Sequence, residues 1–257
     1  MHAVAKVEHY LGGGGYPLGA QQLALNAARH IVLAGDSGSE GTPIRAFTPK
    51  GKLVFEGKLP SFGLGQGLAG GPDYMTGRGL WILNFDGTLR NSYVGGGPTF
   101  ISWGDGPTLI DEQGELFSIG SQHLEPGSSK LTFNLLGRFT PSGEPVWSAT
   151  LDPEVRAGPV LGDTDQLFLT LSTGFEPATP QSLAAFSAAG QLVWQRSLPP
   201  SGPRPSYWLL LNTAGALTVA IDRRVHAYSS GGKRPPRCAY WPTPKGDLGQ
   251  RVAAREK

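Results

Sequence analysis

The chain has 257 residues, a formal net charge of +2 and only 16% charged residues, so it lacks the basic stripe typical of nucleic-acid-binding proteins. It contains 38 Gly and 22 Pro, but 39% hydrophobic residues and 9% aromatic residues exclude a disordered chain and favour many short strands joined by tight turns. The single cysteine, Cys238, excludes an internal disulfide, a multi-cysteine zinc site and a vicinal cysteine pair.

The N-terminal stretch MHAVAKVEHYLGGGGYPLG lacks the apolar run of a signal peptide. No stretch approaches the roughly 20 continuous apolar residues that span a bilayer. We therefore expect neither an export signal nor a membrane span in this sequence.

In chain order, four stretches predict a hairpin of two apolar strands. In each, the first strand ends on Asn, Asp or Gly, which favour tight turns, and the first apolar residue of the second strand follows five positions later. The four stretches are LALNAARHIVLAG (23–35), TLIDEQGELFSIG (108–120), VLGDTDQLFLTLS (160–172) and LLLNTAGALTVAI (209–221).

A second kind of hairpin is centred on a glycine that we expect to have positive φ. An aromatic residue precedes the glycine by four positions and is followed by Thr or Ser, whose hydroxyl can hydrogen-bond across the turn. The copies are AFTPKGKLVF (46–55), RFTPSGEPVW (138–147), AFSAAGQLVW (185–194), AYSSGGKRPP (227–236) and a weaker one, ILNFDGTLRN (82–91). The repeated residues are Phe47, Phe139, Phe186 and Tyr228, the glycines Gly51, Gly87, Gly143, Gly190 and Gly232, and, beyond the turn, Phe55, Trp147 and Trp194.

An inner hairpin followed by an outer hairpin makes a four-stranded unit, and the central glycines recur at the spacing of β-propeller blades. We predict an all-β propeller of about five blades over residues 19–237, with six blades or part of a larger ring as alternatives. The unit around Gly87 shows no clean inner hairpin, so we expect a degenerate blade there. The segments 1–18 and 238–257 remain, and either is a candidate for a strand that closes the ring.

The outer hairpin resembles the repeat of pyrroloquinoline-quinone-type (PQQ-like) β-propellers, in which a small residue, a turn glycine and a tryptophan four residues later dock neighbouring blades. The match is carried by Ala185, Gly190 and Trp194, by Gly143 and Trp147, and by Ala46, Gly51 and Phe55. The tail WPTPKGDLGQR (241–251) resembles a terminal segment of bacterial propellers of this type. The family includes quinone-dependent dehydrogenases and non-catalytic envelope proteins, so the resemblance implies the fold and suggests a bacterial envelope, against which the missing signal peptide argues.

No catalytic constellation is visible in the sequence. The dehydrogenases of this family are larger rings with calcium-binding carboxylates and a vicinal disulfide, so we predict neither the quinone nor calcium as a cofactor. The aspartates and histidines show no recognisable metal-ligand spacing, and most of the aspartates stand at turns. The glycine-rich stretches 11–15 and 63–71 lack the phosphate-binding pattern, and no GxSxG motif occurs.

One group of residues is a candidate binding site. The connections into the innermost strands of a propeller lie at the mouth of its central channel, and aromatic and arginine side chains are well suited to recognition there. The candidates are Trp103, Asp105, Arg156, Arg204, Tyr207 and Trp208, with blade packing and solvated arginines as the alternative interpretation.

We therefore predict a non-catalytic binding or assembly module that holds a protein or small ligand on one face, with no nucleic-acid partner. The alternatives are an enzyme with its active site on propeller loops and a fragment of a larger propeller. The sequence does not identify the ligand, the face used or the compartment.

Overall fold

The protein consists of short antiparallel strands, twenty of them in the part of the chain that the structure describes. The structure is a computed structural model, and it describes residues 22–25, 28–34, 42–59, 69–77, 80–92, 101–103, 108–123, 131–173, 179–199, 207–221 and 224–233. Within these residues, no helix has the length and apolar character needed to cross a membrane.

The strands form five sheets, each from one continuous part of the sequence. The first holds β1 (Gln22–Leu25), β2 (Ile31–Ala34), β3 (Thr42–Phe47) and β4 (Leu53–Leu59). The second holds β5 (Ala69–Gly70), β6 (Tyr74–Thr76), β7 (Trp81–Asn84) and β8 (Leu89–Ser92). The third holds β9 (Ile101–Trp103), β10 (Leu109–Ile110), β11 (Leu116–His123), β12 (Leu131–Phe139) and β13 (Pro145–Thr150). The fourth holds β14 (Glu154–Leu161), β15 (Leu167–Ser172), β16 (Gln181–Phe186) and β17 (Leu192–Ser197), and the fifth holds β18 (Tyr207–Leu211), β19 (Ala216–Ile221) and β20 (Arg224–Ser229).

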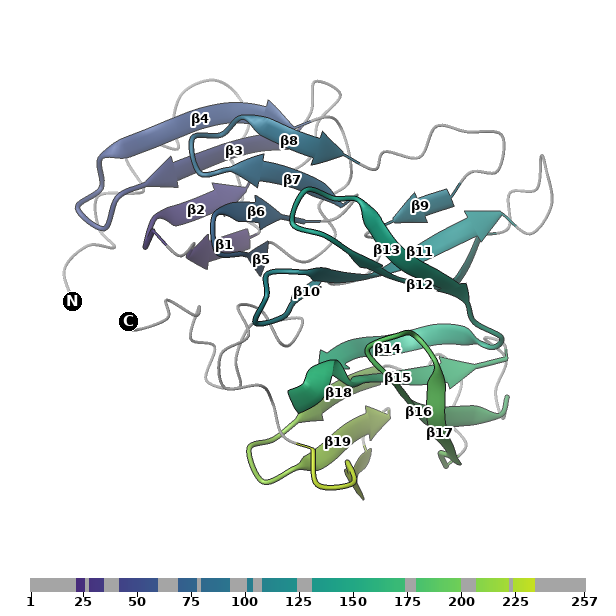
Figure 1. Cartoon of the computed structure of the whole chain (residues 1–257). Helices are drawn as coiled ribbons and strands as arrows, with labels where there is room; N and C mark the ends of the chain where they lie inside the picture. Colours follow the sequence, from purple (N-terminus) through teal and green to yellow (C-terminus); the bar gives the residue numbers. More distant parts are fainter. Residues whose placement is uncertain are drawn as a thin grey trace.

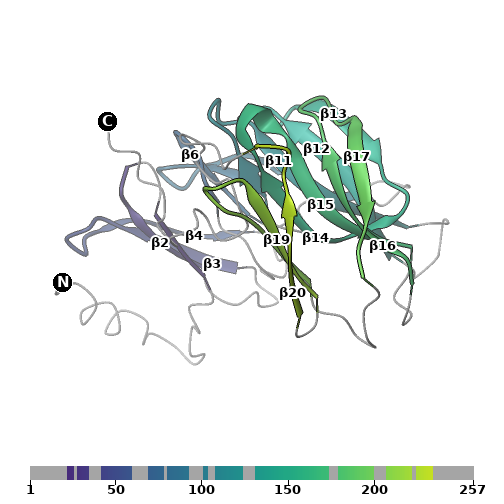
Figure 2. The same ribbon diagram turned by 90° about the horizontal axis from the view of Figure 1, so that it is seen from below.

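The sheets follow one another around a centre, and their innermost strands are β1, β5, β10, β14 and β18. β1 lies against β5, β5 against β10, β10 against β14, and β14 against β18. Figure 1 shows this arrangement, and Figure 2 shows the third, fourth and fifth sheets side by side. The predicted all-β propeller architecture is confirmed, with five sheets in the described residues.

The hydrophobic core lies between consecutive sheets. Its largest fully buried side chain, Trp81, belongs to a cluster shared by the first three sheets. A second cluster joins the third and fourth sheets around Phe117 and Leu169, and a third joins the fourth and fifth around Phe168 and Val219. Because burial occurs mainly between sheets, no sheet completes its core alone.

The unit around Gly87 has a reduced inner hairpin, as the sequence predicted, although all four of its strands are present. The second sheet has four strands, and its inner hairpin is β5 and β6, which pair Ala69 with Thr76. The hairpin escaped prediction because its strands have only two and three residues, joined by Gly71–Asp73, so no apolar periodicity develops. The expected outer hairpin at 227–236 is described only as far as Lys233, and the segments 1–18 and 238–257 lie outside the described residues.

The predicted turn glycines have the expected backbone. All five have φ between +76° and +90°. The turn at Gly143 is representative: its N–H donates to the carbonyl of Thr140 over 2.8 Å, and the Thr140 hydroxyl accepts from the N–H of Glu144 over 3.0 Å. Thr48 and Ser187 make the same hydroxyl contact, so the repeated Thr or Ser holds the turn as the sequence predicted.

The residue four positions after a turn glycine contacts the turn glycine of the next sheet at three successive interfaces. A Cβ on Gly87 would lie 2.7 Å from the ring of Phe55, and one on Gly190 would lie 2.7 Å from the ring of Trp147. At the remaining interface, Asn91 approaches Gly143 and donates to the carbonyl of Ser142 over 2.9 Å. Glycine at these turns therefore serves both the positive φ and the close approach of the neighbouring sheet.

Candidate functional site

Asp111 forms a buried carboxylate at the turn between β10 and β11. Its Oδ1 accepts hydrogen bonds from the backbone N–H groups of Gln113 and Glu115 over 2.9 and 2.8 Å. The Asp111 side chain is completely buried. An aspartate at a strand end satisfies the backbone donors of a tight turn in this way, as the sequence predicted for this hairpin.

Arg138 on β12 occupies the position before the repeated aromatic residue, where three other repeats have Ala46, Ala185 and Ala227. Its Nη2 lies 3.2 Å from Oδ2 of Asp111, and its Nε donates to Oε2 of Glu115. The guanidinium also lies over the ring of Phe117, 5.1 Å from the centroid. A long charged side chain thus stands where the repeat pattern has a methyl group.

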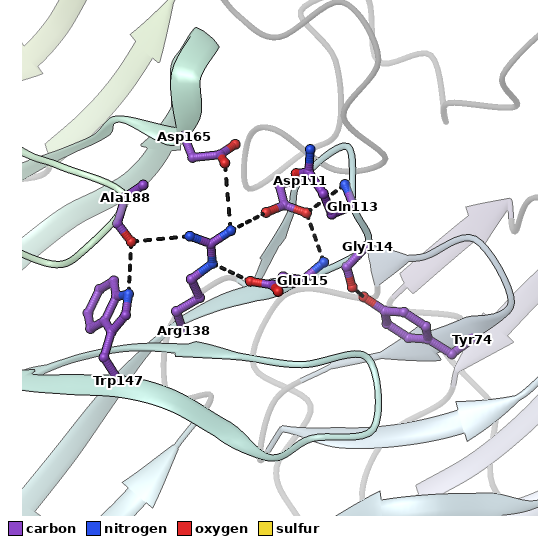
Figure 3. A network of polar contacts seen from close by, with 9 residues as sticks. All are labelled: Tyr74, Asp111, Gln113, Gly114, Glu115, Arg138, Trp147, Asp165 and Ala188. Carbon is purple, nitrogen blue, oxygen red and sulfur yellow. Dashed lines mark hydrogen bonds and ion pairs between the residues drawn. The ribbon is translucent and has the colours of Figure 1, made fainter.

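The same guanidinium reaches the fourth sheet. Its Nη1 donates to the carbonyl of Ala188 over 3.3 Å, and its Nη2 lies 3.7 Å from Oδ2 of Asp165. The indole Nε1 of Trp147 donates to the same Ala188 carbonyl over 2.8 Å. Figure 3 shows these contacts converging from both sheets. We call Asp111, Glu115, Arg138 and Asp165 the Arg138 cluster.

Asp165 is presented by a strained turn. It follows Thr164 in the 3-10 turn Asp163–Asp165, and both have left-handed backbones, with φ of 62° for Thr164 and 55° for Asp165. Each such residue costs about 1 kcal/mol when it is not glycine. The contact of Asp165 with Arg138 is one interaction that offsets this strain.

The electrostatics of the cluster are dominated by burial of carboxylates. Burial, together with the negative charges of Asp165 and Glu115, raises the pKa of Asp111 to about 6 against the lowering effects of the Glu115 N–H and of Arg138. Burial also raises the pKa of Asp165, while Arg138 opposes the rise. Three carboxylates share one guanidinium, so the cluster binds a proton more readily than isolated aspartates do.

Sequence reasoning missed the Arg138 cluster. Its available signal was the arginine at a position where three other repeats have alanine. The spacing of Asp111, Glu115 and Asp165 along the chain carries no such signal. Each lies within 27 residues of Arg138, but they come from two sheets and meet only when those sheets pack together. The cluster joins the third and fourth sheets through one guanidinium and three carboxylates, of which Asp111 has its pKa raised to about 6.

Four of the six sequence-predicted site residues lie within the described residues: Trp103 is the last residue of β9, Tyr207 and Trp208 begin β18, and Arg156 is the third residue of β14. Trp103 pairs with Gly120 in the third sheet. β14 and β18 lie against each other. Asp105 and Arg204 lie outside the described residues, as do the side chains of Trp103, Tyr207 and Trp208.

Arg156 is largely buried, with 7% of its side chain exposed, and its Nη2 lies 3.1 Å from Oε2 of Glu154. Glu154 is in register with Ser172 on β15, which is in register with Gln181 on β16. Ser172 and Gln181 are buried as well. We call Glu154, Arg156, Ser172 and Gln181 the leading-end cluster; it lies at the end of the fourth sheet opposite to Asp165.

Neither cluster is a metal site by composition. Among the described residues, no group of three or more His, Cys, Asp or Glu side chains is arranged to hold a metal ion. The Arg138 cluster already contains a cation at its centre, and the leading-end cluster has a single carboxylate.

Comparisons with known proteins support the fold. No family model and no curated protein matches the chain. A puromycin hydrolase structure is similar with a TM-score of 0.51 and 17% identity over 85% of this chain and 42% of that one. A eukaryotic initiation factor structure has a TM-score of 0.51 and 10% identity, over 88% of this chain and 56% of that one. The WD40 domain of SCAP from fission yeast has a TM-score of 0.49 and 11% identity, over 85% of this chain and 51% of that one. This chain matches about half the length of each of these proteins, and the likeness to the two with TM-scores above 0.5 shows the fold alone.

Proposed function

We propose that this protein is a non-catalytic binding or assembly module that holds a protein segment or small ligand at the leading ends of its innermost strands. The observation that carries the proposal is the Glu154–Arg156 ion pair beside a row of buried polar side chains. Burying a charge pair costs desolvation energy. We attribute the presence of this pair to a role in recognition.

The innermost strand of the neighbouring sheet supports a binding site at the same end of the molecule. β14, whose start carries the leading-end cluster, lies against β18, whose first two residues are Tyr207 and Trp208. Aromatic residues beside a fixed arginine provide contact area and directed charge. In this proposal Arg156 is a positioning residue, held by Glu154, and Arg204 with the aromatic residues contacts the ligand.

The experiment is an affinity capture from the envelope and the cytosol of the source cell, compared side by side. We expect a partner that the wild-type protein retains and that an Arg156→Ala/Arg204→Ala variant loses by at least about 10-fold. The control is Arg196→Ala, which removes an arginine from the outermost strand β17. Both variants are first shown to unfold cooperatively. Full retention of the partner by a folded double variant would overturn the proposal.

We further propose that the repeat is of the PQQ-like type but that the protein uses neither the quinone nor calcium. The contact of Trp147 with Gly190 supports the repeat type, because it reproduces the glycine and tryptophan docking that the sequence resembles. Addition of pyrroloquinoline quinone and calcium should cause no alcohol oxidation with a dye acceptor and no change in melting temperature. Oxidation above the level of a heat-denatured control would show an enzyme instead.

A second candidate is a part of a larger propeller that another chain completes. The observation that favours it is the match to only 42% and 56% of the two structures with TM-scores above 0.5. Light scattering separates the two candidates, because a closed ring is a monomer whereas an open one associates through its free edges.

A further inference from the structure

The Asp163–Asp165 turn, which connects β14 to β15, is held by side chains from both neighbouring sheets. From the third sheet, the Arg138 guanidinium lies 3.7 Å from Oδ2 of Asp165, as Figure 3 shows. From the segment that follows β20 in the fifth sheet, Nζ of Lys233 donates to Oγ1 of Thr164 over 3.0 Å. The turn is therefore a link between three consecutive sheets.

The conformation of this turn is costly. Thr164 and Asp165 both have left-handed backbones, which strain residues other than glycine. Within the described residues, Asp163 Oδ1 and Gln166 Oε1 are buried and accept no hydrogen bond, and a buried acceptor without a partner carries a desolvation cost. A rearranged turn can return both acceptors to water and relax both backbones. The contacts from the two neighbouring sheets offset these costs in the closed turn.

The charges around the turn are predominantly negative. In the part of the chain that the structure describes, the charged groups around Asp165 are Asp111, Glu112 and Glu115 from the β10–β11 hairpin, Arg138 from β12 and, through Thr164, Lys233. Burial raises the pKa of Asp165, and the charges of Glu112 and Glu115 add to the rise against the lowering effect of Arg138. An ionised Asp165 is therefore less stable in the closed turn than in water, and a bound proton removes that penalty.

We propose that the Asp163–Asp165 turn is a pH-dependent switch that a proton on the Arg138 cluster keeps closed and that opens away from Arg138 and Lys233 when the proton is lost. The direction follows from the charges. Without the proton, three carboxylates share one guanidinium, and release of Asp165 to solvent reduces their repulsion and relieves the backbone strain. The contact between Lys233 and Thr164 breaks in the same step, so opening also loosens the fifth sheet. The proposal rests on the fold and is independent of the proposed function.

The test is hydrogen exchange of the full chain by mass spectrometry at pH 5 and at pH 7.5, corrected for the intrinsic exchange rate at each pH. The reporter is the N–H of Gly162, which donates to the carbonyl of Gln166 across the turn over 2.7 Å. Its protection should be at least about 10-fold lower at pH 7.5, because the closed turn binds the proton more tightly than the open one. The internal reference is the N–H of Gly51, which donates to the Thr48 carbonyl over 2.8 Å and should keep its protection.

The wild-type protein alone can overturn the proposal. Equal protection of Gly162 at the two pH values would exclude a pH-dependent opening. An equal loss of protection at Gly162 and at Gly51 would show that the whole fold responds to pH and not this turn.

Two variants separate a switch from a turn with a structural role alone. Asp165→Asn tolerates the left-handed backbone but cannot ionise, so the pH effect on Gly162 should fall below about 2-fold. Lys233→Met should lower the protection of Gly162 at both pH values and leave the pH effect in place. The matched control is Lys52→Met, which directly follows the turn glycine of the first repeat as Lys233 follows Gly232, and it should change neither. An unchanged pH effect in Asp165→Asn, or unchanged protection in Lys233→Met, would overturn the proposal.

Discussion

The interface between the third and fourth sheets and the interface between the fourth and fifth use the same sequence pattern with different results. Trp147 covers Gly190 and donates to the Ala188 carbonyl. Trp194 has the same place in its repeat, but a Cβ on Gly232 would meet no atom within 4 Å. Trp194 packs instead on Phe168, with centroids 6.0 Å apart, and beneath Arg196.

The difference lies in the receiving turn. The turn at Gly190 has one glycine with positive φ, and it directs the Ala188 carbonyl at both Trp147 and Arg138. The turn before Lys233 has two, Gly231 and Gly232, and the Ser230 hydroxyl bonds to the carbonyls of Gly215 and Lys233 within its own sheet. We therefore expect a docking tryptophan to contribute more to stability where the next turn offers a matching surface.

Trp147→Ala should have the largest effect. It removes a ring packed on Phe117 and the neighbouring turn, and should lower the free energy of unfolding by about 3–4 kcal/mol. Trp194→Ala should cost about 1–2 kcal/mol, because less of its surface is covered by the next sheet. Urea denaturation of both variants measures the difference. Equal losses would mean that the two interfaces are equivalent.

Arg138→Met should cost about 3 kcal/mol at pH 7, because it leaves the buried Asp111 carboxylate beside Glu115 and Asp165 without a cation. The loss should shrink at pH 5, where the cluster takes up a proton. The matched control is Arg45→Met on β3, whose partner Glu56 is half exposed and whose loss should be below about 1 kcal/mol. Thermal unfolding of both variants at pH 7 and at pH 5 measures the loss of stability in each case. A pH-independent loss for Arg138→Met would argue against the electrostatic explanation.

Gly190→Ala should cost about 2–3 kcal/mol, since the new methyl group adds a clash with Trp147 to the strain of a positive φ. Gly232→Ala adds the strain without the clash and should cost about 1 kcal/mol. The comparison isolates the contribution of docking. It is measured by chemical denaturation, and restoration of Gly190→Ala by a second change, Trp147→Phe, would identify the clash directly.

The smallest expected effect is a pH dependence of stability. The pKa of Asp111 is about 6 in the folded protein and 3.8 in the unfolded chain, so the folded state binds more protons between these values. Stability should therefore rise by about 1 kcal/mol as the pH falls from 7 to 5, and this gain is lost as the pH rises through 6. Asp111→Asn keeps an acceptor for the turn and should flatten the profile, which thermal unfolding between pH 4.5 and 7.5 would show.

Much of the fold was predictable because it depends on local chemistry. The glycines, the Thr and Ser hydroxyls and the apolar strands act within about ten residues of one another, and the structure has the expected turns at Gly51, Gly143 and Gly190. The second sheet was underestimated because β5 and β6 are too short to produce a pattern. The Arg138 cluster was not predictable, because its carboxylates converge only when the third and fourth sheets pack together.

The sequence by itself determined the repeating unit, the positions of its turns and the all-β propeller class, since each depends on residues that are neighbours along the chain. The tertiary structure decided which repeats dock, because Trp147 and Trp194 differ only in the turn that the next sheet presents. It also decided that Arg138 joins two sheets. These properties depend on the relative placement of sheets, which the burial of a shared core fixes and which no single stretch of sequence encodes.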